Sequence, residues 1–159
     1  MVPFAGVGGA GRQERRTVSQ GVQAGTTSAR DGHPRALFLC RSLMNWTLMG
    51  ANLLERGEYA RAEAFLTLVH GHLLRAMRLV EGKSANWLSP TRRLEEDASA
   101  TSYERYRECT AALEAEKLAR AYASTWEWGR ELMGKLAARH ALTLPEALLD
   151  KLDRRLRTG

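Results

Sequence analysis

Isoleucine is absent from this chain, and beyond residue 33 the only valines are Val69 and Val80. Leucine, alanine, glutamate and arginine dominate that part of the sequence instead. β-Branched side chains are stiff at χ1 and favour strands, whereas the four common residue types here are good helix formers. The sequence therefore predicts an all-α fold, and its 159 residues suffice for one domain with an appendage.

Apolar residues from Pro34 onward recur at steps of three and four, which is the spacing of one helix face. The first helix is expected to begin between Asp31 and Pro34 and to end at Gly57. The second is expected over 58–81, with Gly82 closing it. Charged residues interrupt both helices, and each would cost roughly a few kcal/mol near a bilayer midplane, so neither is expected to span a membrane. An antiparallel helical hairpin is the expected result.

Turn and capping residues divide the remaining sequence into further helices. The expected elements are a helical turn opened by Ser89 and Pro90 and reaching Glu96, a helix capped by Ser99 or Thr101 and reaching Leu113, a long helix over 115–140, and a last helix started by Thr143 and Pro145 and ending near Arg157. We therefore expect a bundle of five or six helices over residues 34–159.

Residues 1–33 have a different composition, with half of the 14 glycines, four arginines and Phe4 as the single aromatic residue. Such a segment cannot bury enough apolar surface to offset the entropy of ordering, so we expect a disordered leader. A transit peptide is the competing interpretation, because the segment is rich in arginine and poor in acids, but it lacks an amphipathic stripe. Its arginines would bind nucleic acid only weakly and without reading bases, so no nucleic-acid partner is expected.

Aromatic residues are concentrated between residues 87 and 128. Tyrosine and tryptophan combine a large apolar face with a polar atom, so they suit a core edge or a ligand wall equally well. The segment contains the string WLSPTRRLEED from Trp87 to Asp97, a Tyr103-x-x-Tyr106 pair followed by Cys109-Thr110, the pair Ala121-Tyr122, and Trp126-x-Trp128 followed by Glu131-Leu132.

This ordered series resembles the C-terminal helical part of lincosamide nucleotidyltransferases, and the resemblance covers roughly residues 34–142. It implies an antibiotic-resistance enzyme that transfers AMP from ATP to a hydroxyl of a lincosamide, with magnesium. In such enzymes an N-terminal domain holds the catalytic aspartates, while the helical domain helps to form the acceptor pocket and the dimer. The resemblance therefore implies a homodimer and a small-molecule antibiotic as partners.

The catalytic domain of that family should show a Gly-Ser pair and an Asp-x-Asp motif, because two carboxylates must hold magnesium against the phosphates. Neither is present: Gly6 to Gly11 reads GVGGAG, with Glu14 the only acid nearby. A glycine-rich loop binds phosphate where it joins a strand to a helix, and no strand precedes this one. We expect this chain alone to bind neither ATP nor magnesium, and a nucleotidyltransferase domain to be supplied in trans.

The candidate substrate-binding residues are aromatic or imidazole side chains, namely His70, Trp87, Tyr103, Tyr106 and Trp126. Glu127 is a weak candidate for a catalytic residue, since a carboxylate against two indole faces would be desolvated and could deprotonate an acceptor hydroxyl. The alternative is a surface glutamate with the tryptophans packed on opposite sides. For His70 the alternative is a hydrogen-bonded histidine of the core.

The charged residues around Pro90 also allow two interpretations. Arg92 and Arg93 could contact ATP phosphates from a partner domain or form ordinary ion pairs with Glu96. The acidic run of residues 95–97 is typical of a solvated helix face. The basic residues of the C-terminal end, which are Lys151, Arg154, Arg155 and Arg157, are also best explained as a solvated face that complements a helix C-terminus.

No metal site is expected. His70 and His72 are two residues apart, which on a helix points them about 200° apart and prevents chelation from one face. Cys40 and Cys109 form no CxxC pair, and inside helices they are typical of small buried residues in a reduced, cytoplasmic protein.

A different class of function remains open, in which the chain is a stand-alone helical interaction module or a toxin–antitoxin-type partner of a small nucleotidyltransferase. RNase members of that helical family resemble one another in an arginine followed four to six residues later by histidine. None of the four histidines has an arginine at that distance, which disfavours RNA cleavage. A degenerate fragment with no function is the third interpretation.

Overall fold

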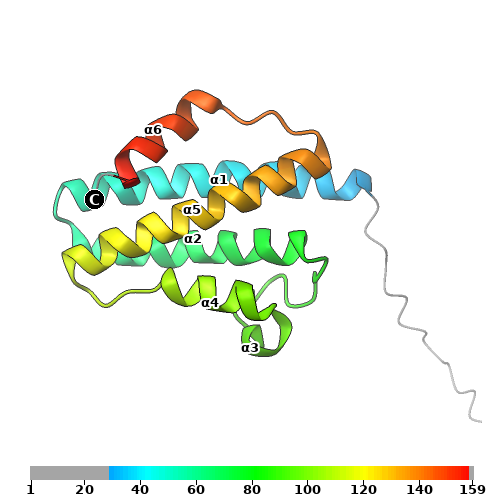
Figure 1. The fold of residues 1–159 in the computed structure, drawn as a ribbon, viewed down its shortest axis with the longest axis horizontal. Helices are drawn as coiled ribbons and strands as arrows, with labels where there is room; N and C mark the ends of the chain where they lie inside the picture. The colour runs from blue at the N-terminus through cyan, green and yellow to red at the C-terminus, as the bar shows by residue number, and fades with distance from the viewer. Residues whose placement is uncertain (1–28, 158–159) are drawn as a thin grey trace, which may run out of the picture.

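The computed structural model describes residues 29–157, and these residues form six helices and no strand (Figure 1). The helices are α1 (Ala29–Glu55), α2 (Tyr59–Val80), α3 (Leu94–Asp97), α4 (Ala100–Glu108), α5 (Ala115–His140) and α6 (Glu146–Arg157). The predicted all-α bundle is confirmed. The predicted leader, with its glycine-rich stretch at Gly6, lies largely within residues 1–28, which are outside the described part of the chain. Its expected disorder stays a prediction.

The helical hairpin is formed by α1 and α2, which run antiparallel (Figure 1). Gly57 ends α1 as predicted, because its φ of 73° lies in the left-handed region that glycine adopts readily. The N–H of Gly57 donates to the carbonyl of Leu54 and the N–H of Glu58 to the carbonyl of Leu53, both at 3.0 Å. The start of α1 differs from the expectation. The helix begins at Ala29, so that it extends into the segment assigned to the leader and contains Pro34.

The third long helix, α5, packs against both arms of the hairpin and crosses α1 obliquely (Figure 1). Its bounds coincide with the predicted range of 115–140. Tyr122 of α5 is fully buried, and its hydroxyl donates a 2.6 Å hydrogen bond to the carbonyl of Ala62 in α2. Gly50 of α1 permits this approach, because a Cβ at that position would overlap the Tyr122 ring. The three long helices are therefore joined at one point in the core.

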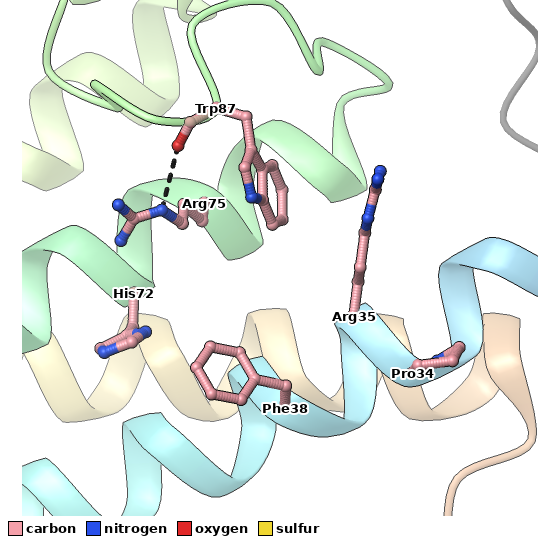
Figure 2. A pocket seen from close by; sticks show the side chains of 6 residues that line it. All are labelled: Pro34, Arg35, Phe38, His72, Arg75 and Trp87. Carbon is pink, nitrogen blue, oxygen red and sulfur yellow. Dashed lines mark hydrogen bonds between the residues drawn. The ribbon is translucent and has the colours of Figure 1, made fainter.

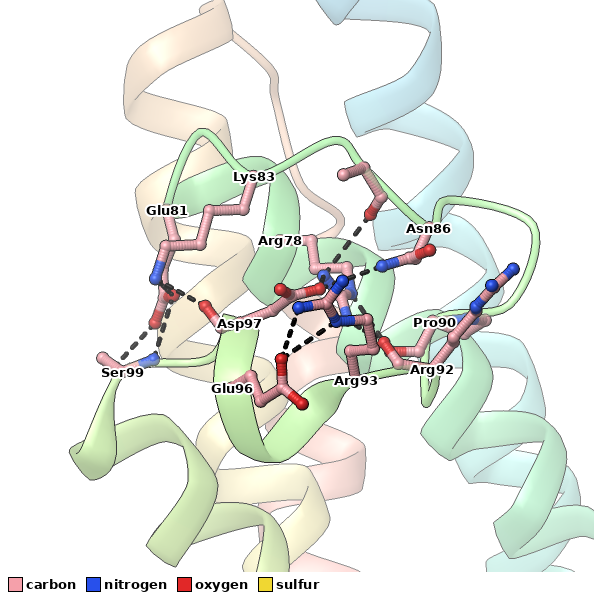
Figure 3. A network of polar contacts seen from close by, with 11 residues as sticks. Arg78, Glu81, Lys83, Asn86, Pro90, Arg92, Arg93, Glu96, Asp97 and Ser99 are labelled. Carbon is pink, nitrogen blue, oxygen red and sulfur yellow. Dashed lines mark hydrogen bonds and ion pairs between the residues drawn. The ribbon is translucent and has the colours of Figure 1, made fainter.

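The segment between α2 and α4 is organised around Arg78, whose side chain is 1% exposed (Figure 3). The guanidinium donates to the carbonyls of Pro90 and Arg92, both at 3.0 Å, and pairs with the carboxylate of Asp97 at 3.2 Å. Asn86 donates to the same carboxylate at 2.9 Å. The string from Trp87 to Asp97 is thus a loop folded over one buried arginine. Ser89 caps no helix, because α3 begins only at Leu94.

Helix α4 begins where the sequence predicted but ends earlier. Ser99 is the N-cap, and its hydroxyl accepts a hydrogen bond from the N–H of Ser102. The helix stops at Glu108 rather than near Leu113, because the carbonyl of Arg107 accepts from both the N–H and the hydroxyl of Thr110.

Helix α6 lies across α1 and α5 and buries Leu149, Leu152 and Leu156. Arg155 fastens it to α1 through two hydrogen bonds to Glu55. Within residues 29–157, no helix has the length and apolarity needed to cross a bilayer.

Candidate functional site

The six residues singled out from the sequence lie in three separate places. His70, Tyr103 and Tyr106 lie where α2, α4 and α5 meet, Trp126 and Glu127 line a hollow between α5 and α6, and Trp87 lines a groove between α1, α2 and the loop after α2. They therefore do not form one pocket, and each place has to be judged by its own geometry.

His70 has the position of a core histidine. Its side chain is 8% exposed, and its Nε2 donates a 3.0 Å hydrogen bond to the carbonyl of Cys109. Burial lowers the pKa of His70 to about 4, against the opposing effect of that hydrogen bond, so the ring is neutral at pH 7. Tyr106 contacts it edge to face at 5.3 Å, and Tyr103 packs half-buried against the core. These contacts tie α4 to α2, so this cluster serves packing.

His72 points away from His70 and meets Phe38 of α1, with ring centroids 5.7 Å apart. The opposed directions agree with the helical spacing of the two histidines. Among residues 29–157, no cluster of three or more His, Cys, Asp or Glu side chains has an arrangement that could hold a metal ion.

The hollow between α5 and α6 has a volume of about 350 Å³ and is called the Trp126 hollow below. Its walls are Ala123, Trp126, Glu127, Arg130, Asp153, Leu156 and Arg157. Trp126 is 3% exposed and donates from Nε1 to Asp153 at 2.7 Å, which fixes both the indole and the carboxylate. Asp153 is also approached by Arg130 at 3.7 Å and Arg157 at 3.9 Å.

Two acids and two arginines give the Trp126 hollow no net charge, and indole and leucine carbons supply an apolar part of its wall. Glu127 is exposed at its edge, while Trp126 and Trp128 are buried on either side of it. This is the surface position of the alternative interpretation, not a carboxylate enclosed by indoles. Within the described part of the chain, Glu127 has no ion-pair partner, so its oxygens are free to accept hydrogen bonds.

The groove between α1, α2 and the loop after α2 has a volume of about 460 Å³ and is called the Trp87 groove below. Its lining residues are Pro34, Arg35, Phe38, His72, Arg75 and Trp87 (Figure 2). Arg75 donates from Nε to the carbonyl of Trp87 at 3.0 Å, and the guanidinium of Arg35 lies over the indole at 5.6 Å from its centroid. The loop held by Arg78 therefore presents Trp87 to the hairpin.

Sequence reasoning missed most of the Trp87 groove. Phe38 and His72 lie off the buried stripes of their helices, and an aromatic outside the apolar stripe was the only signal for them. Arg35 and Arg75 gave no signal, because a single arginine in a helix is typical of a solvated face. Of Arg92 and Arg93, for which the sequence allows a phosphate contact or an ion pair with Glu96, Arg93 pairs with Glu96 at 3.0 Å.

Asp97 differs from the solvated acid that was expected. Hydrogen bonds from Asn86 and Arg78 hold the pKa of its carboxyl below the usual value. The acid at the end of the family-like string therefore serves to stabilise the loop.

The family model described as lincosamide nucleotidyltransferase-like, C-terminal domain, matches residues 32–155. The match begins in the first turn of α1 and ends within α6, so it includes the Trp87 groove, the loop around Arg78 and all of the Trp126 hollow except Leu156 and Arg157. No curated protein matches the chain.

Proposed function

The chain belongs to the lincosamide nucleotidyltransferase-like C-terminal domain family, and on that premise we propose that it binds the hydroxyl-bearing acceptor for a nucleotidyltransferase domain supplied in trans. The observation that carries this proposal is the Trp126 hollow, where free carboxylate oxygens lie beside an apolar wall. The acceptor is a small antibiotic of the lincosamide type, and the reaction is transfer of AMP to one of its hydroxyls.

The chemistry of the Trp126 hollow fits such an acceptor. A molecule with several hydroxyls and an apolar part needs hydrogen-bond acceptors and donors around a hydrophobic surface. Glu127 offers the acceptors, Arg130 and Arg157 the donors, and Leu156 apolar surface. Glu127 binds the hydroxyl that is to be modified and is the candidate to remove its proton.

We infer that magnesium is held by the nucleotidyltransferase domain, because two of the carboxylates nearest the family-like loop, Asp97 and Glu81, are already engaged. Magnesium binds through carboxylates that are free to coordinate it. Asp97 accepts from Arg78 and Asn86, and Glu81 accepts from the hydroxyls of Ser99 and Ser102. These carboxylates are engaged in holding the loop and the start of α4, so no step through the metal is assigned to this chain.

The domain is also proposed to pair with a second copy of itself. Trp46, Met49 and Leu68 are 36%, 45% and 48% exposed, and the tilted rings of Trp46 and Phe65 are in contact with centroids 5.6 Å apart, so this apolar surface spans α1 and α2. A twofold dimer buries the same patch on both copies, so this exposed apolar surface would pack against its own counterpart. The same surface would serve the alternative function, an interaction module for a separate small nucleotidyltransferase. Sedimentation of the purified chain distinguishes a dimer from a monomer, and Trp46→Glu should abolish the dimer.

The reaction is tested by reconstitution. The full chain, ATP, magnesium and clindamycin should give no adenylated product until a separately expressed nucleotidyltransferase domain of a lincosamide nucleotidyltransferase is added. Glu127→Gln should raise the KM for clindamycin about tenfold in the reconstituted system, the loss expected for about 1.4 kcal/mol of charge-assisted hydrogen bonding. It should also lower kcat, because the amide cannot take the proton of the hydroxyl. Glu116→Gln, an exposed glutamate on the same helix outside the hollow, is the control and should leave the KM unchanged.

Two outcomes would contradict the proposal in different ways. Turnover by the chain alone would show that the catalytic groups are present in it. A Glu127→Gln variant with unchanged kinetics would show that the acceptor binds elsewhere.

A further inference from the structure

The Trp87 groove is distinct from the Trp126 hollow in both place and charge. Two of its six lining residues are arginines and none is an acid. Most arginines in the described part of the chain face a carboxylate, but neither Arg35 nor Arg75 has one within ion-pair distance. The groove is therefore a local concentration of positive charge without an internal counter-charge.

The two guanidiniums are held in place without being neutralised. Arg75 donates to the carbonyls of Trp87 and Gly71, both at 3.0 Å, and these contacts leave part of its fork unused. Arg35 is exposed and held only by its contact with the indole face of Trp87. Neutral carbonyls and a ring fix the position of an arginine but leave its charge available to an anion.

Aromatic rings form the other walls. Trp87, Phe38 and His72 face the same space from the loop, from α1 and from α2 (Figure 2). Phe38 is 59% exposed, so its face is open to a ligand. Desolvation and the nearby Arg75 lower the pKa of His72, which favours the neutral ring.

We propose that the Trp87 groove binds a small anion attached to a flat ring, such as a phosphate ester or carboxylate of an aromatic compound. The ring lies between Trp87 and the Phe38 side of the groove, and the anion lies beside the guanidinium of Arg35, with Arg75 adding positive charge from the other side of Trp87. This site does not depend on the acceptor proposal, because the Trp87 groove and the Trp126 hollow share no residue.

The test uses the full chain and three probes, namely phenyl phosphate, inorganic phosphate and phenol. Titration calorimetry gives the affinity, and the ¹⁵N–¹H signal of the Trp87 indole, assigned with Trp87→Phe, reports the place of binding. Phenyl phosphate should bind more tightly than either half of its structure and should shift the Trp87 signal. Binding should weaken as salt is raised, because the arginines are partly exposed.

Variants separate this site from general attraction to a basic protein. Arg35→Gln removes an exposed charged side chain from the groove. It should weaken the binding of phenyl phosphate about fivefold, the factor expected for loss of the attraction between two unit charges in contact in water. Arg41→Gln removes an exposed arginine from the same helix outside the groove and should change nothing. Equal losses in the two variants, or binding that leaves the Trp87 signal unmoved, would overturn the proposal.

Two further probes identify the source of the anion. Tighter binding of 5′-AMP than of benzoate points to a nucleotide, and the reverse order points to an aromatic acid. Failure of phenyl phosphate, 5′-AMP and benzoate alike to bind at millimolar concentration and low salt would show that the groove is not a ligand site.

Discussion

Replacement of Gly50 by alanine tests the junction on which the bundle is built. Alanine in place of glycine inside a helix ordinarily stabilises it by about 1 kcal/mol. At Gly50 the new methyl group would overlap the ring of Tyr122, which is fully buried and hydrogen-bonded to Ala62. Overpacking of this kind costs about 1–3 kcal/mol, and loss of the hydrogen bond costs about 1 kcal/mol more. The net expectation is a loss of about 1–3 kcal/mol.

The chain provides a matched control for this change. Gly134 lies in α5, is exposed, and has no atom within 4 Å of the position that a Cβ would take. Gly134→Ala should therefore stabilise the protein by about 0.5–1 kcal/mol. The two variants have the same chemical change in a helix and opposite expected signs.

Urea denaturation followed by circular dichroism at 222 nm measures both effects as changes in the free energy of unfolding. In a Tyr122→Leu background the overlap is removed, so Gly50→Ala should become neutral or stabilising, and the double-mutant cycle gives the coupling between the two positions. A Gly50→Ala protein that is as stable as the parent would refute the arrangement of α1, α2 and α5.

Three other predictions concern the loop, a buried histidine and the cysteines. Arg78→Met should lower the free energy of unfolding by about 3 kcal/mol, because it leaves the carbonyls of Pro90 and Arg92 without a donor and Asp97 with Asn86 alone. Hydrogen exchange of residues 83–98 should accelerate, and unchanged exchange would show that the loop does not depend on this arginine. The pKa of His70 in the folded protein, about 4, lies below the value of about 6.5 for an unfolded chain, so the stability that depends on the neutral ring is complete above pH 6.5 and is lost as the pH falls toward 4. Between pH 7 and pH 5 the loss should be about 2 kcal/mol, measured as the difference between the parent and His70→Gln, and equal pH dependence in both would disprove it. Burial raises the pKa of both Cys40 and Cys109 to about 11, so a thiol reagent should label neither in the native protein at pH 7 and both after unfolding, whereas rapid native labelling would contradict their burial.

The helices could be predicted from the sequence because their signals are local. The steps of three and four among leucines and alanines, the glycine that ends α1 and the serine that caps α4 act within a few residues of themselves. The errors lie where a neighbouring segment decides. The early start of α1 is an example, because Gly32 and His33 pack against His140 at the end of α5, with His33 Nδ1 2.9 Å from the His140 carbonyl. The early end of α4 is instead a local effect, because Thr110 hydrogen-bonds to the carbonyl of Arg107.

The sites could be predicted only in part, because they are made by contacts between residues distant in sequence. Trp87 and Trp126 are both aromatic residues of one segment, yet the fold places Trp87 in the Trp87 groove and Trp126 in the Trp126 hollow. Arg78 resembles any charged residue of an amphipathic helix, and only the loop folded over it reveals its role. Residue type indicated which side chains could bind a ligand, whereas the packing of α6 and of the loop determined which are accessible.

The central claim is that this domain holds the acceptor by itself, in the Trp126 hollow. It is tested most directly by titrating the full ¹⁵N-labelled chain with clindamycin and following the four tryptophan indole signals, assigned by single substitutions. We expect saturable shifts at Trp126, none at Trp87, and weaker binding in Glu127→Gln than in Glu116→Gln. Shifts centred on Trp87, or no saturable shift at any indole, would contradict it.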